Sequence, residues 1–281
     1  MALPQISPEI WTQLLFGLAL GGLIGVLAWR LGSLSRSGAL AATLTGGLIF
    51  GLGGLAWAVL LLAFFISSSL LSRLFAGRKR VLSENFSKGS RRDWAQVVAN
   101  GGLGALLAAA HAFSPGEVWP WIAFAGAMAA VNADTWATEL GVLNPTPPRL
   151  ITSGKVVERG TSGAVSLWGS LAALGGAGLI ASLAALFSAG QTGPGQAGAM
   201  LAAATLGGLC GSTFDSLLGA TLQAIYWCPT CGKETERHPR HTCGTDTVQI
   251  RGWRWLDNDW VNGLASLVGA LVTLGVWQLF Y

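Results

Sequence analysis

Five polar residues interrupt an apolar stretch that is long enough to cross a membrane. The segment from Ala130 to Gly141 reads A-V-N-A-D-T-W-A-T-E-L-G, and it carries Asn132, Asp134 and Glu139. Ionisable groups inside a membrane-spanning segment are energetically costly, so they usually serve function. The alternative is a polar patch where helices pack, but two carboxylates are a costly way to make such contacts. We therefore expect this segment to carry chemistry.

Three further polar segments lie beside other apolar runs. One is a basic, glycine-containing loop at residues 148–163. Asp215 lies within a later apolar run, and Asp257 and Asp259 precede the last one. Carboxylates from separate helices can bind one or two Mg²⁺ ions, which prefer oxygen ligands and bridge to substrate phosphates. The pattern therefore indicates phosphoryl or nucleotidyl transfer.

The residue types predict distinct roles in such a transfer. Basic side chains would neutralise phosphate charge. The turn at residues 160–163 is expected to open a helix, where backbone N–H groups at the positive dipole end could bind phosphate. The expected catalytic residues are Asp134, Glu139, Lys155 and Asp215. The expected Mg²⁺ ligands are Asp134, Asp215, Asp257 and Asp259. The expected nucleotide- and phosphate-binding residues are Asn100, Asn132, Arg149, Thr152, Lys155, Arg159, Gly160, Thr161 and Gly163.

A group of cysteine and histidine residues predicts a second metal site. Cys228 and Cys231 form a C-P-T-C-G knuckle typical of zinc ribbons, and His241 and Cys243 follow. Tetrahedral Zn²⁺ takes four N or S ligands, which these residues supply, with His238 as a competing fourth ligand. A disulfide is the alternative, but the loop is expected to be cytoplasmic, where thiols stay reduced. A full set of protein ligands predicts a structural zinc ion.

Composition predicts a membrane protein. Of the 281 residues, 52% are hydrophobic and only 11% are charged, and the mean hydropathy is +0.53. A soluble domain has about 25% charged residues, so a soluble enzyme is excluded. The forty glycines suit closely packed transmembrane helices. We expect one all-α polytopic domain over residues 1–281, with a small cytoplasmic zinc-ribbon-like insertion at residues 227–256 between the last two helices.

The apolar runs divide into about eight predicted spans. With this division all 17 Lys and Arg residues fall on one side of the membrane. The positive-inside rule then places both termini outside and the basic loops, with the active site, in the cytoplasm. The basic segment at residues 73–93 is expected to anchor anionic headgroups, or alternatively to steer an anionic substrate. The predicted spans are 9–29, 37–52, 54–75, 94–113, 118–142, 163–188, 197–226 and 260–280.

Four segments together resemble a known family. They read N-A-D-T-W-A-T-E-L-G, P-R-L-I-T-S-G-K-V-V-E-R-G-T-S-G, F-D-S-L-L-G-A and L-D-N-D-W-V-N, in that order. From about Ser37 to the C-terminus the chain resembles the phytyl-phosphate kinase family, an integral membrane group that includes the transmembrane protein 19-like proteins. More distantly it is similar to dolichol and phytol kinases and to CDP-diacylglycerol synthases. Those families have a Lys-x-x-Glu-Gly loop, which Arg159 interrupts here.

The resemblance implies an activity and its partners. It implies transfer of a phosphate from a nucleoside triphosphate, expected to be CTP, to an isoprenyl monophosphate such as phytyl or geranylgeranyl phosphate. The expected partners are this lipid, the nucleotide and membrane lipids, without nucleic acid, and the expected cofactors are Mg²⁺ and structural Zn²⁺. A cytidylyltransferase or a polyprenol kinase acting on a lipid alcohol is the alternative. A small-molecule or ion transporter is the alternative of another class, although the polar groups crowd one face instead of the midplane.

Overall fold

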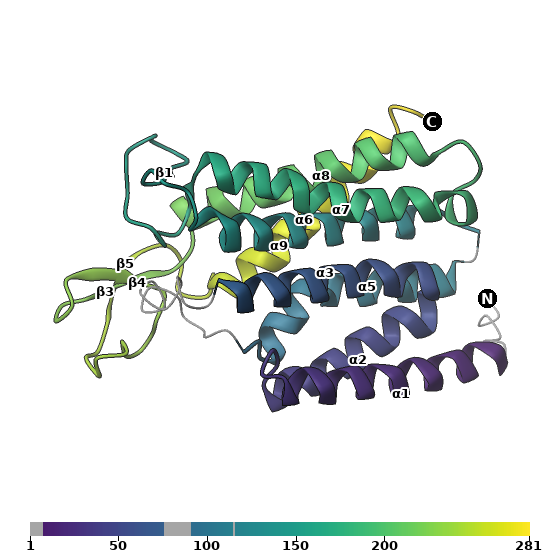
Figure 1. Ribbon diagram of the computed structural model, residues 1–281, viewed down its shortest axis with the longest axis horizontal. Helices are drawn as coiled ribbons and strands as arrows, with labels where there is room; N and C mark the ends of the chain where they lie inside the picture. The colour runs from purple at the N-terminus through teal and green to yellow at the C-terminus, as the bar shows by residue number, and fades with distance from the viewer. Residues whose placement is uncertain (1–7, 76–90, 115) are drawn as a thin grey trace.

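The computed structural model describes residues 8–75, 91–114 and 116–281. In these residues the chain forms eight α-helices packed side by side, with short strands in the loops at one end (Figure 1). Residues 76–90 of the predicted headgroup anchor lie outside the described residues. The helices are α1 (Pro8–Arg30), α2 (Arg36–Gly53), α3 (Leu55–Leu74), α5 (Trp94–Phe113), α6 (Trp119–Gly141), α7 (Leu167–Gln191), α8 (Ala197–Thr221) and α9 (Asn258–Trp277).

Each described helix corresponds to one predicted span, although the ends of some differ. Six of these helices, all except α2 and α6, are long and apolar enough to cross a membrane by length and composition. Helix α6 carries Asn132, Asp134 and Glu139, and it packs against α3, α5, α7, α8 and α9. Because protein surrounds α6 on so many sides, it can carry polar groups without presenting them to lipid. The prediction of a multi-pass membrane helix bundle is confirmed, and crossing by α2 and α6 stays a prediction.

The start of α7 differs from the predicted span. That span was expected to begin at residue 163, but α7 begins at Leu167. The intervening Ala164–Val165 (β2) pairs antiparallel with Arg149–Leu150 (β1). Ser166 then caps the helix, because its hydroxyl accepts a hydrogen bond from the backbone N–H of Gly169 at 3.1 Å. Apolar residues that were assigned to the membrane therefore form a small hairpin in the loop.

A three-stranded antiparallel sheet follows α8. Its strands are β3 (Ile225–Cys228), β4 (Lys233–Thr235) and β5 (Val248–Arg251), in the order β4-β3-β5. The seventh span was predicted to reach residue 226, but α8 ends at Thr221 because the following apolar residues enter β3. The all-α prediction therefore holds for the bundle, while the loops at its end contain short strands.

Helices α6, α8 and α9 approach closely through glycine residues. A Cβ atom added to Gly211 of α8 would lie 2.7 Å from the carbonyl oxygen of Ala265 on α9. A Cβ atom added to Gly269 of α9 would lie 2.6 Å from the Cβ of Ala130 on α6. Both distances are shorter than non-bonded carbon contacts allow, so only glycine permits this spacing. The close packing fixes the three helices against one another next to their polar ends.

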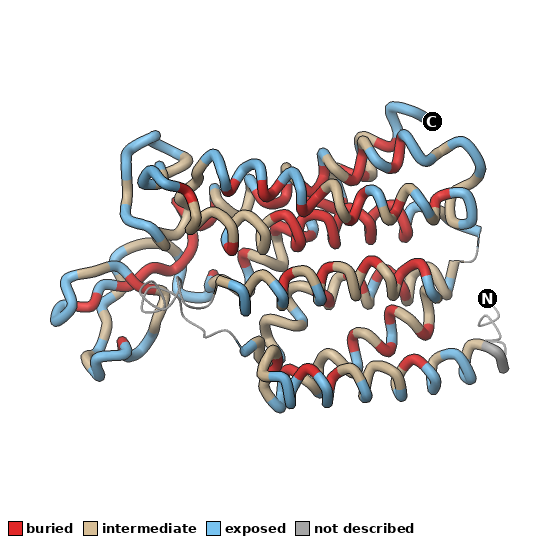
Figure 2. The backbone as a smooth tube through the Cα atoms, in the orientation of Figure 1, coloured by how far each residue is buried: buried red, intermediate tan, exposed pale blue. Residues whose placement is uncertain are grey.

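The two ends of the bundle differ in character. The start of α1 and the C-terminus lie at one end, and the strands lie at the other (Figure 1). Buried positions are concentrated in the helices around α6, whereas α1 is mostly exposed along its length (Figure 2). On α1 the exposed side chains include Leu15, Phe16 and Leu23. A helix that presents such apolar side chains outward is suited to contact with lipid.

Candidate functional site

Three carboxylates from three elements converge at the strand-bearing end of the bundle. Asp134 lies on α6, Asp215 lies on α8, and Glu236 directly follows β4. Asp134 and Glu236 both act electrostatically on Asp215. The Oδ2 atom of Asp215 is buried, and in the described part of the chain it has no hydrogen-bond partner. We call these residues the acidic trio; a buried, unsatisfied oxygen among like charges is suited to a cation.

Gln223 links the acidic trio to the basic loop. Its side chain is almost fully buried, with 1% exposure. The Ser162 hydroxyl donates to Gln223 Oε1 at 2.7 Å, and Gln223 Nε2 donates to Glu236 Oε1 at 2.9 Å. A single buried amide thus joins the loop before α7 to the insertion after α8. Neither Gln223 nor Glu236 was predicted from the sequence, because neither occurs in a recognisable motif.

The two predicted metal ligands at the start of α9 have different surroundings. Asp257 is exposed and caps the helix, since its Oδ1 accepts hydrogen bonds from the backbone N–H groups of Asp259 and Trp260 at 3.0 and 3.2 Å. Asp259 lies in the first turn of α9, and its Oδ1 atom is buried. Helix capping explains the presence of Asp257 at this position. Asp259 remains a candidate ligand of Mg²⁺.

Asn132 is used in helix packing. Its side chain has no exposed surface. Its Nδ2 donates to the carbonyl oxygen of Gly176 on α7 at 2.8 Å, and its Oδ1 accepts from Ser67 Oγ on α3 at 3.1 Å. Trp136 Nε1 donates to the same Ser67 hydroxyl at 3.1 Å. The Asn132 amide therefore joins three helices. Since both of its polar atoms are used in these hydrogen bonds, the structure does not favour Asn132 as a phosphate ligand.

Glu139 lies among α3, α6 and the start of α5. Its side chain is 6% exposed, and its Oε1 accepts a hydrogen bond from Ser72 Oγ at 2.6 Å. Among the described residues, Arg92, just before α5, is a cation on which Glu139 acts. Burial lowers the pKa of Arg92 to about 10, and the negative charge of Glu139 acts against that change. Glu139 is therefore suited to orient neighbouring groups.

The basic loop between α6 and α7 is braced by its own guanidinium groups. Arg149 Nη1 donates to the carbonyl oxygen of Gly154 at 2.8 Å. Arg159 Nη2 donates to the carbonyl oxygens of Asn144 and Pro145 at 2.8 and 3.0 Å. These hydrogen bonds hold the loop in shape, while both arginine residues remain exposed to solvent. Arg149 and Arg159 therefore lie where an anionic ligand can reach them.

The glycine turn and the lysine of this loop were predicted to form a phosphate cradle. The turn does not open α7, because β2 and the Ser166 cap separate it from the helix, so the expected helix-dipole contribution at Gly160–Gly163 is wrong. Thr161 lies in this turn, and Gly163 packs against Ala220 of α8. Thr152 and Lys155 are exposed at the loop tip, and Lys155 forms no ion pair with any residue that the structure describes.

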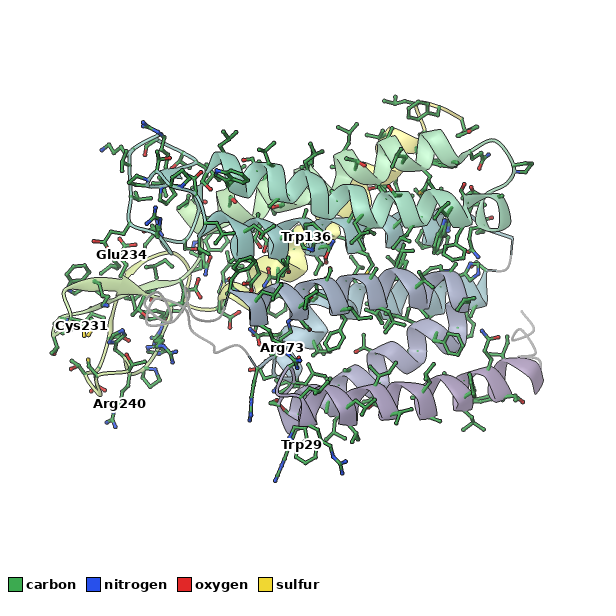
Figure 3. The ribbon with its side chains drawn as sticks, in the orientation of Figure 1. Trp29, Arg73, Trp136, Cys231, Glu234 and Arg240 are labelled. Atoms are coloured by element: carbon green, nitrogen blue, oxygen red, sulfur yellow. The ribbon has the colours of Figure 1, made fainter. Side chains whose placement is uncertain are left out.

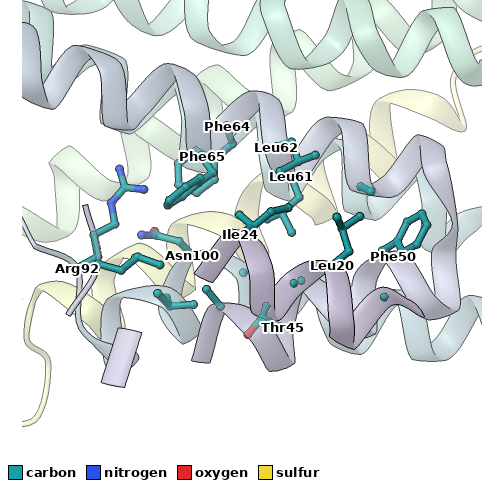
Figure 4. Close-up of a pocket in the computed structure, with 18 of the residues that line it drawn as sticks. Leu20, Ile24, Thr45, Phe50, Leu61, Leu62, Phe64, Phe65, Arg92 and Asn100 are labelled. Carbon is teal, nitrogen blue, oxygen red and sulfur yellow. The ribbon is translucent and has the colours of Figure 1, made fainter. Parts of the chain in front are cut away.

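Asn100 lies in the wall of a cavity. It lies on α5 and lines an apolar cavity between α1, α2, α3 and α5, together with Gln96 and Arg92 (Figure 4). Gln96 also forms a capping box with Asp93, whose Oδ1 accepts from the Gln96 backbone N–H at 3.0 Å. The structure therefore associates Asn100 with this cavity, whose lining also includes Arg92, the residue on which the charge of Glu139 acts.

Four metal-ligand side chains gather in the insertion after α8. One ligand atom from each of Cys228, Cys231, His241 and Cys243 lies within 4.8 Å of the others. The Cys228 and Cys243 sulfur atoms are 3.5 Å apart, and His241 Nδ1 lies 3.5 and 3.4 Å from the sulfurs of Cys231 and Cys243. Zn–S bonds of about 2.3 Å in a tetrahedron separate sulfurs by roughly 3.8 Å. The donor set and its spacing therefore fit a metal ion, at the outer part of the loop where Figure 3 labels Cys231.

His238, the competing fourth ligand, faces elsewhere. Its ring stacks on Tyr226 of β3 with a centroid separation of 4.5 Å and an interplanar angle of 10°. It is not among the residues of the Cys3His group in the described chain. The structure therefore favours His241 over His238 as the nitrogen ligand.

The fold and the site together define a multi-pass integral membrane protein with carboxylates gathered at one end of its bundle. The chain belongs to the family described as integral membrane protein DUF92, whose model matches residues 19–270. This confirms, at the level of the family, the resemblance carried by the four sequence segments. No solved structure matches the chain.

Three curated relatives support this assignment. Protein PGR of Arabidopsis thaliana is 32% identical over 287 residues, covering 96% of this chain and 97% of the relative. An uncharacterized membrane protein of Methanocaldococcus jannaschii is 34% identical over 190 residues, covering 68% of this chain and 75% of the relative. Protein VTE6, chloroplastic, of Arabidopsis thaliana is 26% identical over 250 residues, covering 87% of this chain and 66% of the relative.

Proposed function

We propose that the chain is an integral membrane kinase of isoprenyl monophosphates. It would transfer the terminal phosphoryl group of a nucleoside triphosphate, CTP, to phytyl or geranylgeranyl phosphate and release the lipid diphosphate. Family membership and the similarity to Protein VTE6, chloroplastic, support this proposal. The observation that carries it is the convergence of Asp134, Asp215 and Glu236 at one end of the bundle.

The acidic trio fits a divalent cation. Mg²⁺ takes oxygen ligands and commonly uses one or two carboxylates together with substrate phosphates. The buried Oδ2 of Asp215 has no donor among the described residues, and two of the described charges that act on it, those of Asp134 and Glu236, are acidic. We propose Asp134, Asp215 and Glu236 as ligands, with Asp259 as a further candidate. When bound, Mg²⁺ would neutralise charge on the triphosphate oxygens.

The chain's own residues would supply positioning and charge. In the transfer, an oxygen of the acceptor phosphate bonds to the terminal phosphorus while the bond from that phosphorus to the nucleoside diphosphate breaks. A phosphate monoester has its second pKa near 6, so the acceptor is ionised at neutral pH and requires no strong general base. The exposed Lys155 and Arg149 would bind the triphosphate, and stabilising its developing charge is the main contribution to such catalysis.

We propose that the Cys3His group binds zinc in a structural role. Three thiolates and one imidazole complete a tetrahedral shell and leave no position for a substrate. Glu236 lies between Cys231 and His241 in the chain. A zinc ion held by Cys228, Cys231, His241 and Cys243 would therefore fix the segment that carries Glu236.

We also propose that the strand-bearing end faces the cytoplasm. All 17 Lys and Arg residues belong to this side in the predicted topology. Positively charged loops are retained on the cytoplasmic side of a membrane, and nucleoside triphosphates are found there. The acidic trio would then face the compartment that supplies its nucleotide, with both termini outside.

The test is a turnover assay on purified protein with phytyl phosphate and each of the four nucleoside triphosphates. We expect lipid diphosphate to form, and we expect Asp134→Ala to abolish it while Glu234→Ala, an exposed position on β4, leaves it unchanged. Full activity of folded Asp134→Ala protein would exclude the metal-site assignment. A CMP-linked lipid would instead indicate a cytidylyltransferase, and phosphorylation of the alcohol alone would indicate an alcohol kinase. Flux in liposomes without turnover would indicate a transporter.

A further inference from the structure

An apolar cavity lies between α1, α2, α3 and α5 (Figure 4). Its walls are formed mainly by aliphatic and aromatic side chains, among them Leu20, Leu61 and Phe65. Helix α2 contributes wall residues from Ala42 to Phe50, which corresponds to about 12 Å along a helix axis. An elongated apolar space of this kind is suited to a hydrocarbon chain.

One end of the cavity carries polar groups. Arg92 and Asn100 lie at this end in Figure 4, and Phe50 lies at the other. The Arg92 guanidinium lies 5.3 and 6.0 Å from the ring centroids of Phe64 and Phe65. Within the described chain, this guanidinium donates no hydrogen bond to an acceptor. A half-buried cation at the end of an apolar cavity is complementary to a molecule with an anionic head and an apolar tail.

The polar end of the cavity adjoins the acidic helix. The charge of Glu139 on α6 acts on Arg92. Glu139 follows Asp134 by five residues, which is about 7.5 Å along the helix. A head group bound at Arg92 would therefore lie near the segment of α6 that leads to the acidic trio.

We propose that this cavity binds the part of the acceptor's isoprenyl tail that lies next to its phosphate group, and that Arg92 binds the phosphate group. The inference rests on the proposed kinase function, because it names the place where that kinase would hold its lipid. Phospholipids also combine phosphate with apolar chains, but they carry two chains and a phosphodiester. A single prenyl chain with a terminal monophosphate suits an apolar cavity that has the Arg92 guanidinium at one end.

A leucine at Gly46 provides a way to fill the cavity. A Cβ atom at this α2 position would lie 3.7 Å from Leu61 Cδ2, which is ordinary van der Waals contact, so the helix can accept a side chain there. Leucine also favours a helix more than glycine does. Gly178→Leu on α7 is the matched control, because a Cβ atom there has nothing within 4 Å.

The experiment measures binding and turnover on the same full-length protein. Native mass spectrometry of detergent-purified protein would follow bound geranylgeranyl phosphate, and the kinase assay would follow its KM. We expect Gly46→Leu to weaken binding and raise KM by about tenfold or more, the loss expected when roughly two buried methylene groups are displaced. Gly178→Leu should match the wild type. Arg92→Gln should weaken binding of geranylgeranyl phosphate but not of geranylgeraniol.

Each other outcome has a definite meaning. Wild-type binding by folded Gly46→Leu and by a second cavity variant, Ala58→Leu, would overturn the tail site. Equal competition by phosphatidylglycerol would overturn the choice of a prenyl phosphate. If Gly46→Leu weakens binding of geranylgeranyl phosphate but the wild type shows no kinase turnover, the tail site stands and the kinase function is rejected. The two proposals can therefore fail separately.

Discussion

Replacing Gly163 with alanine is expected to destabilise the protein through two separate effects. Gly163 has a φ angle of +79°, in the left-handed region, where a residue with a Cβ atom costs about 1–2 kcal/mol. The added Cβ would also lie 2.5 Å from the Cβ and 2.6 Å from the Cα of Ala220 on α8. Overpacking of this kind costs about 1–3 kcal/mol. The expected decrease in the free energy of unfolding is therefore about 2–5 kcal/mol.

Gly154→Ala in the same loop separates the two effects. Gly154 has a φ angle of +66°, but a Cβ atom there has nothing within 4 Å. Its expected cost is only the conformational one, about 1–2 kcal/mol. The assay is denaturant-induced unfolding of detergent-purified protein, followed by tryptophan fluorescence. Equal losses for Gly154→Ala and Gly163→Ala would refute the conclusion that the loop is packed tightly against α8.

The contact at Gly163 also has an expected effect on activity. A Cβ atom on Gly219 of α8 would lie 2.8 Å from Ser162 Oγ and 2.9 Å from the Gly163 nitrogen, so the loop rests on this helix at two points. Asp215 lies four residues before Gly219 and shares its helix face. Alanine at position 163 would push the loop and the Ser162–Gln223 hydrogen bond away from Asp215. We expect lower turnover even at temperatures where the variant remains folded.

Three further predictions follow from the site and the topology. Glu236→Gln should lower kcat by about tenfold or more in the kinase assay, whereas Glu234→Gln, exposed on the adjacent strand, should not; equal activities would remove Glu236 from the metal set. His241→Ala should lose zinc by metal analysis of the purified protein, while His238→Ala should retain it, and zinc in both variants would contradict the ligand assignment. Tags at either terminus should be cut by external protease on intact cells; protection of both tags would reverse the proposed orientation.

The positions of the helices could be predicted because each apolar run ends at charged residues or glycine. The span predicted at 94–113 coincides with α5, which begins where Asp93 supplies a helix cap. The predictions failed at the start of α7 and at the end of α8. There, Ala164, Val165 and Ile225 are as apolar as their helical neighbours but pair as strands. Hydropathy cannot distinguish these two uses of an apolar residue.

The candidate site was predictable only in its helical part. Asp134 and Asp215 are conspicuous because each is an acidic residue within an apolar helix, and the structure brings them into electrostatic range. Glu236 lies in a polar loop, where an acidic residue is ordinary. Its position depends on the β3–β4 hairpin and on the hydrogen bond from Gln223, which form only when the insertion folds against the end of α8. The residue type and its immediate neighbours therefore did not single out Glu236.

The position of Glu236 depends on the fold of its loop, and this connects the proposed zinc site to catalysis. A double variant can test the connection. Asp134 and Asp215 are fixed by packed helices, whereas Glu236 lies on a loop whose shape the metal at His241 would maintain. If zinc acts on turnover only by holding Glu236, then His241→Ala should lower kcat to the level of Glu236→Gln. The double variant should then lose no more than either single variant, because coupled residues are not additive. Losses that multiply would show that the metal acts on another part of the site, and the Gln223 bridge to Ser162 would be the first such part to examine.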